Sequence, residues 1–195
     1  MKFKDFDHLV KKSLEKVLRA EIAKKRPKMR SAIKAVITDA IYDCPEMQSL
    51  RLDKLKYDFG LTEDPSWPIA WAVADSMKLK YIITDEYVGG FEVSVQPGKY
   101  DNLYALSVAY QDTEKGQSLP WLQWLLEHGD AIIIADFGVK YTNHGRSGGA
   151  VMIENFRPFR VDPSYSGVAG NNFITRALNS SLPLIQSTAW QIFTS

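Results

Sequence analysis

The sequence predicts an α+β fold, in which N-terminal helices are followed by a mostly antiparallel sheet with packed helices. Apolar residues recur at helical spacing up to about residue 77, and beyond it they alternate in short runs bounded by glycine and proline. Helices first and strands afterwards, with no repeating strand–helix–strand unit, is the order typical of α+β proteins. We expect a single domain over residues 1–195, with a helical region (about 1–77) and a strand-rich region (about 78–195).

Two amphipathic helices separated by a proline are expected at the start of the chain. Residues 3–24 form the first helix and residues 29–41 the second. Pro27 should end the first helix, because proline lacks an amide hydrogen and clashes with the preceding turn. The apolar residues at helical spacing are Phe6, Leu9, Val10, Leu14, Val17, Leu18 and Ile22 in the first helix, and Ile33, Val36, Ile37 and Ile41 in the second. Two alternatives stay open for the first helix: it packs inward through Phe6, Leu9, Leu14, Val17 and Leu18, or it is an exposed arm that meets a partner.

Short strands and further helices are expected after these two. A helix over about residues 64–77 should begin at Asp64 or Ser66, because either side chain can accept a hydrogen bond from the first turn. Strands are expected at 81–84, 91–95, 103–110, 131–134, 138–142 and 150–153, with Gly89-Gly90 as a turn. Later helices are expected at 121–128, at 173–178 behind a cap at Asn171 or Asn172, and at 184–193 after Pro183.

Charge is distributed unevenly along the chain, although the net charge is only +1. Residues 1–34 contain 12 lysine or arginine residues and 4 aspartate or glutamate residues, a net charge of +8. The remainder contains 12 and 19, a net charge of −7. This polarity suits head-to-tail contact between copies, or a basic face for nucleic acid, and a solvated helix face is the simpler alternative.

The composition excludes several classes of protein. Hydrophobic residues make up 45% and charged residues 24%, so the chain can bury a core and is not disordered as a whole. Cys44 is the single cysteine, so no intramolecular disulfide forms, and a buried thiol is its expected role. No apolar run approaches the roughly 20 residues of a membrane span, and the N-terminus lacks a signal-peptide core. We therefore expect a protein of a reducing, aqueous compartment with no membrane partner.

A glycine-rich segment, 145–149, matches G-x-S-x-G, the nucleophile elbow of serine hydrolases. That elbow requires an acid and then a histidine later in the chain, and it leads into a helix. The histidines are His8, His128 and His144, so none follows Ser147, and the next residues have the pattern of a strand. A glycine-rich hairpin loop is the favoured interpretation, and phosphate binding by Arg146 and the loop amides is a weaker one.

Outside this loop, the sequence offers packing residues rather than reactive ones. Three histidines and one cysteine have no metal-ligand spacing, so we expect no catalytic, cofactor or metal site, no small-molecule substrate and no enzymatic activity. Trp121, Trp124 and Leu125 lie at helical spacing, which indicates core or interface packing. The same interpretation applies to the stretch of Trp67, Ala70 and Trp71.

Three groups of segments share a resemblance to one family. They are 41–50 with 55–61, then 121–129, and then 146–152 with 159–163 and 172–178. These segments resemble virion proteins of contractile-tailed bacteriophages, in the neck and tail-completion group. Phe159 and Asp162 stand where the resemblance leads us to expect tryptophan and proline. The resemblance implies a structural protein in a ring, with neither catalysis nor a cofactor, and it does not fix which ring.

The expected function is therefore that of a phage virion structural protein, a tail terminator or connector that joins head and tail. It would be made in the host cytoplasm and reside in the virion, in contact with its own copies, with other neck or tail proteins and with DNA passing through the ring. The alternative is a nucleic-acid-binding accessory protein that uses the basic N-terminal helices. The candidate interface residues are Lys24, Lys25, Arg26, Trp121, Trp124 and Arg146.

Overall fold

The structure, a computed structural model, describes residues 3–83, 89–95, 99–113, 116–154 and 157–195. For residues 3–9, 11, 83, 89 and 90 it describes the backbone alone, so the expected inward packing of Phe6 and Leu9 lies outside the described side chains. The helices are α1 (Phe3–Tyr42), α2 (Pro45–Leu52), α3 (Lys54–Asp58), α4 (Ser66–Asp75), α5 (Asp101–Tyr104), α6 (Trp121–Glu127) and α7 (Phe173–Thr194), with a 3₁₀ turn η1 (Ser107–Ala109). The strands are β1 (Lys78–Ile83), β2 (Gly89–Ser94), β3 (Gln111–Asp112), β4 (Ser118–Leu119), β5 (Phe137–Tyr141) and β6 (Ala150–Glu154).

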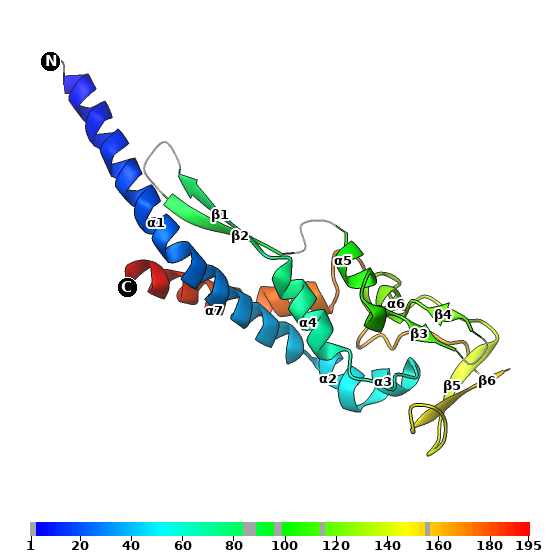
Figure 1. The fold of residues 1–195 in the computed structure, drawn as a ribbon. Coiled ribbons are helices and arrows are strands. Elements are labelled where there is room, and N and C mark those ends of the chain that lie inside the picture. Colours follow the sequence, from blue (N-terminus) through cyan, green and yellow to red (C-terminus); the bar gives the residue numbers. More distant parts are fainter. Residues whose placement is uncertain (1–2, 84–88, 96–98, 114–115, 155–156) are drawn as a thin grey trace.

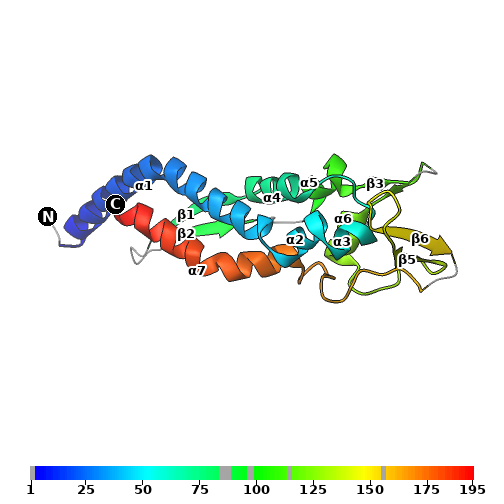
Figure 2. The same cartoon turned by 90° about the horizontal axis from the view of Figure 1, so that it is seen from below.

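The α+β class is confirmed, but the strands do not form one sheet. The described strands make three separate antiparallel ribbons, β1–β2, β3–β4 and β5–β6, each of two strands. Gly89 and Gly90, predicted as a turn, pair within β2 opposite Ile83 and Ile82. The long axis of the molecule is set instead by α1 and α7, which run antiparallel with the β1–β2 ribbon beside them, while α6 and the β3–β4 and β5–β6 ribbons lie at the far end (Figures 1 and 2).

The prediction that Pro27 breaks the first helix was wrong, because α1 runs for 40 residues with Pro27 inside it. A proline frees the carbonyl four residues earlier, here that of Ala23, and both residues are exposed, so water can satisfy it. Buried Ile22 and Met29 hold the helix to the body on either side. Pro183 likewise lies inside a continuous helix, α7, so residues 173–194 form one helix and not the two that were predicted.

Two predicted strands are not strands in the structure. Residues 103–110 instead form the end of α5 and the η1 turn, because the Tyr100 carbonyl accepts bonds from both Leu103 and Tyr104 and starts a helical turn. Residues 131–134 were expected to be a buried strand, yet Ile132 is 60% exposed and a single bridge joins Ile134 to Phe159. The three consecutive isoleucines raise the β propensity, but no strand among the described residues extends this pairing.

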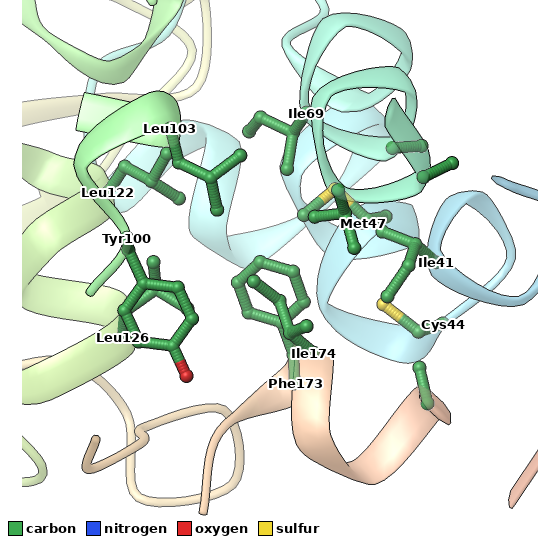
Figure 3. Packing of buried hydrophobic residues seen from close by; sticks show 14 of the residues in the cluster. Ile41, Cys44, Met47, Ile69, Tyr100, Leu103, Leu122, Leu126, Phe173 and Ile174 are labelled. Carbon is green, nitrogen blue, oxygen red and sulfur yellow. The ribbon is translucent and has the colours of Figure 1, made fainter. Parts of the chain in front are cut away.

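The core joins the helical and strand-rich regions in one hydrophobic cluster. Figure 3 shows the first turn of α7 pointing Phe173 and Ile174 among side chains of α1, α2, α4, α5 and α6. Phe173 and Leu103 are fully buried there, as is Met47 of α2. The start of α7 therefore closes the core, and the rest of α7 returns along α1 (Figure 2).

Asn172 fixes that start, and the structure decides between the two predicted caps. Its side-chain oxygen accepts bonds from Ile174 N (3.1 Å) and Thr175 N (3.3 Å), while Thr175 Oγ1 accepts from Asn172 N (2.9 Å). Its amide nitrogen donates to Tyr100 Oη at 2.7 Å and also lies within hydrogen-bonding distance of the carbonyls of Leu126 and Val168. One fully buried amide therefore caps α7 and ties it to the start of α5 and to α6.

We predict that Asn172→Ala lowers the free energy of unfolding by about 3 kcal/mol, because it removes a helix cap and leaves buried polar partners unsatisfied. Urea denaturation measures the change. The matched control is Asn171→Ala, since Asn171 is exposed and next in the chain. An equal, small effect of both substitutions would contradict the role assigned to Asn172.

Candidate functional site

The N-terminal part of α1 is an apolar surface that the subunit leaves uncovered. Residues 3–21, called the arm below, extend past the C-terminal end of α7 (Figures 1 and 2). Val10 and Leu14 are each 49% exposed, and Val17 is 60% exposed. Of the two alternatives for the first helix, inward packing or an exposed arm, these exposures favour the arm, and the buried apolar face of α1 begins only at Ile22.

The apolar residues of the arm follow the core-facing residues of the same helix in four-residue steps. At about 100° per residue each such step turns the stripe by about 40°, so Leu14 lies about 80° around the helix axis from Ile22. Ile22 is buried, whereas Leu14 and Val10 beyond it are about half exposed.

Of the basic interface candidates Lys24, Lys25 and Arg26, the last two bind other parts of the same subunit. Lys25 Nζ donates to the Phe193 carbonyl at 2.8 Å and lies 5.9 Å from the centre of that ring. Arg26 donates to the Leu79 carbonyl at 3.1 Å. Lys24 is exposed and makes no hydrogen bond or ion pair within the described chain. A charge reversal of all three would therefore also disturb α7 and β1.

A second uncovered apolar surface lies at the other end of α1, on α4. Trp67 is 56% exposed and Trp71 is 51% exposed, and the two lie one turn apart. Tyr42, the last residue of α1, contacts Trp67 edge-on with ring centroids 5.8 Å apart. Lys34 Nζ lies 4.2 Å from the centre of the Trp71 ring. The sequence grouped these tryptophans with Ala70 as packing residues, but only Ala70 is buried.

Exposed carboxylates lie close in sequence to Tyr42 and to the start of α4. The exposed residues Asp39 and Asp43 lie within a turn of Tyr42, and the exposed residues Glu63 and Asp64 directly precede α4, with Asp64 Oδ1 accepting from Ser66 N at 2.9 Å. Residues 39–75 contain eight acidic and three basic residues, a net charge of −5, so most of the −7 outside residues 1–34 falls here. We call Trp67, Trp71, Asp39, Asp43, Glu63 and Asp64 the acidic–aromatic face.

The other three interface candidates line a cavity of about 430 Å³ next to the β5–β6 ribbon. Trp121 is fully buried, with Nε1 donating to the Val108 carbonyl at 2.9 Å, so its ring has no surface to offer a neighbour. Trp124 is half-buried against Phe159, with ring centroids 6.3 Å apart. Arg146 is exposed at the rim and donates to the Asp112 carbonyl, which ties its loop to β3.

The glycine-rich loop beside this cavity is shaped by close contacts. Gly145 has a φ of +101°, and a Cβ there would lie 2.0 Å from the Ala150 carbonyl oxygen. A Cβ at Gly149 would lie 2.3 Å from the ring of Tyr57. Ser147 Oγ is buried and has no hydrogen-bond partner within the described residues, so no described histidine or carboxylate is placed to activate it. The geometry supports a hairpin loop rather than a nucleophile elbow.

A polar cluster that the sequence did not reveal links α3 to β5. Lys54 Nζ donates to Tyr141 Oη (2.6 Å) and Asp58 Oδ2 (3.1 Å), and Tyr141 donates to Asp58 Oδ1. Burial raises the pKa of the Asp58 carboxyl group above its usual 3.8, against the opposing effects of Tyr141 and Lys54. The pKa of Tyr141 is also raised, first by burial and then by its bond to Asp58. The cluster holds two elements together across the cavity wall.

Reactive groups are scarce in the described part of the chain. Burial raises the pKa of the Cys44 thiol to about 12, so it stays protonated at neutral pH. No group of three or more His, Cys, Asp or Glu side chains among the described residues could hold a metal ion. No described helix contains a stretch both long and apolar enough to cross a membrane.

No family model, curated protein or solved structure matches this chain.

The Asp58 cluster predicts a specific pH dependence. Because the folded protein binds the Asp58 proton more tightly than the unfolded chain, this stabilisation is present below pH 3.8 and is lost as the pH rises through the raised pKa. Asp58→Asn removes it. The free energy of unfolding of the variant relative to wild type should therefore increase between about pH 3 and about pH 7.

Urea denaturation at several pH values measures this difference, and Asp53→Asn is the matched control because Asp53 is exposed. A difference between wild type and Asp58→Asn that stays constant with pH would contradict the raised pKa.

Proposed function

We propose that the protein is a structural subunit of a bacteriophage virion that forms a homo-oligomeric ring at the neck or tail end, as a tail terminator or connector. The ring would join head and tail, contact other neck or tail proteins, and allow DNA to pass through it. The sequence resemblance is the basis for the virion role, and the geometry of the arm is the observation that supports assembly.

The arm supports assembly because its apolar side chains stay exposed to water in an isolated subunit. Three aliphatic side chains of the arm, Val10, Leu14 and Val17, face water on a part of α1 that extends beyond the rest of the subunit. Burying such groups contributes about 25 cal/mol per Å² of apolar area, and helix faces of this kind bind grooves or other helices in a partner. A helix exposed on this scale is typical of an assembly element.

A ring also requires that two different surfaces of a subunit meet. Residues 1–34 carry a net charge of +8 and the remainder −7, so contact between unlike ends of neighbouring copies is favoured over contact between like ends. Lys12 and Lys16 are exposed on the arm, while Arg19 is paired with Glu15 at 2.7 Å. Exposed ion pairs each contribute only about 0–1 kcal/mol, so charge sets orientation and the apolar stripe supplies affinity.

We predict that Leu14→Asp combined with Val17→Asp converts the assembled protein into monomers and leaves the fold intact. Both side chains are exposed in the subunit, so the free energy of unfolding of the monomer should stay within about 0.5 kcal/mol of wild type per site. Mass photometry measures the assembly state, and negative-stain images show whether wild-type assemblies are rings. The matched control is Leu184→Asp, an exposed leucine on α7 that should assemble like wild type.

Two outcomes would contradict the proposal. Wild-type protein that stays monomeric at high concentration and binds no tail or capsid protein would exclude a ring subunit. Binding of DNA by that monomer, with an affinity that falls steeply as salt rises, would support the nucleic-acid-binding alternative instead.

A further inference from the structure

Resting on the proposed ring, through which DNA would pass, we infer that one side of α1 binds the phosphate backbone of duplex DNA. Residues 22–34 contain six lysine or arginine residues and no acidic residue. Over a longer part of α1, basic residues recur at the three- and four-residue steps that keep side chains on one side of a helix. These residues are Lys12, Lys16, Arg19, Arg26, Arg30 and Lys34.

The six basic residues form a row along the helix. At about 100° per residue they lie within a sector about 80° wide, and at about 1.5 Å per residue they extend over about 33 Å. That length is close to one helical turn of duplex DNA, about 34 Å. All of them except the partly buried Lys34 are exposed. The row is therefore long and open enough to follow a DNA backbone.

Contacts place this row on the side of α1 that carries α4 and the β1–β2 ribbon (Figure 1). Arg26 donates to the Leu79 carbonyl of β1 at 3.1 Å, and Lys34 pairs with Asp75 of α4 at 2.5 Å. The pKa of the Asp75 carboxyl group is lowered, first by its bond to Lys34 and then by the charges of Lys34 and Arg30. A groove of about 420 Å³ lies between α1 and the ribbon. Its lining includes Arg19, Arg26, Lys80, Tyr81 and Phe91.

The six residues of the row and Lys80, called the basic face below, are only partly neutralised within the described chain. Three of the seven pair with carboxylates. The pairs are Arg19–Glu15 at 2.7 Å, Lys34–Asp75 at 2.5 Å and Lys80–Glu92 at 3.9 Å. Lys12, Lys16 and Arg30 make no hydrogen bond or ion pair with the described residues. Seven cations and three carboxylates leave a net charge of +4 on this face.

The arrangement fits a nucleic-acid backbone better than a membrane. DNA carries one negative charge for about every 1.7 Å of its axis, so a long basic face can meet several phosphates at once. A helix that binds a membrane inserts apolar side chains. The exposed large apolar residues among the described side chains of α1 end at Val17, whereas the basic row continues to Lys34. They also lie about 140–160° around the helix axis from the row, so the arm can assemble while the basic face meets DNA.

Two double variants with the same loss of charge on the same helix test the inference. The face variant is Lys16→Ala with Arg30→Ala. The control is Lys24→Ala with Lys28→Ala, whose exposed side chains point about 120–160° away from the row. Fluorescence anisotropy measures the binding of a labelled DNA duplex of random sequence, about 30 base pairs long, between about 50 and about 200 mM salt.

The affinity of the wild type should fall as salt rises, with a constant slope on logarithmic axes. The slope of the face variant should be smaller by about 1.8, because each lost phosphate contact contributes about 0.9, and the control should keep the wild-type slope. The deficit of the face variant should consequently grow about 10-fold as salt falls from about 200 to about 50 mM.

Circular dichroism checks that both variants fold, and mass photometry of the same samples measures assembly. Equal losses in the two variants would show a response to total charge alone and would overturn the inference. Assembled wild-type protein that does not bind the duplex at the lowest salt would overturn it and leave the ring proposal standing. Binding to vesicles that contain phosphatidylserine, without binding to the duplex, would overturn it equally. A wild-type protein that never assembles would instead refute the proposed function.

Discussion

The unbroken backbone of α1 through Pro27 is the constraint on which the rest of the molecule depends. A helix that ended at Pro27 would leave residues 1–26 free to fold back on the body. Instead, buried Ile22 and Met29 hold both sides of the proline to the body, and the exposed position of Pro27 leaves the freed carbonyl of Ala23 to water. The arm consequently keeps a fixed direction, past the C-terminal end of α7 (Figure 1).

The body of the subunit is built to hold that helix. Asn172 fixes the start of α7, and α7 then packs antiparallel along α1 until Lys25 meets the carbonyl of Phe193 near its end. On the other side, α4 packs on α1 with Ala70 and Ala74 buried, while its half-exposed tryptophans contact α1 side chains, Trp67 at Tyr42 and Trp71 at Lys34. Burying alanine and exposing tryptophan reverses the usual preference. That reversal is the reason for treating the face of α4 as a candidate surface.

Local patterns in the sequence predicted those elements whose periodicity and caps agree, such as α6, β5–β6 and the asparagine cap of α7. The misses have tertiary causes. Proline tends to end a helix, but packing on both sides of Pro27 and Pro183 keeps α1 and α7 continuous. The apolar run at 131–134 has no strand to pair with among the described residues. The acidic–aromatic face was hidden because helical spacing alone does not tell an inward tryptophan from an outward one. The count of carboxylates in 39–75 was the available signal.

Photo-cross-linking tests most directly whether the arm takes part in assembly. Cys44 is buried and protonated, so a cysteine introduced at exposed Ser13 is the reactive one. After labelling with a benzophenone maleimide and illumination, Ser13→Cys should give covalent oligomers under denaturing conditions, whereas Ser187→Cys, at an exposed position on α7, should give monomers. Monomers from the labelled Ser13→Cys protein would contradict assembly through the arm.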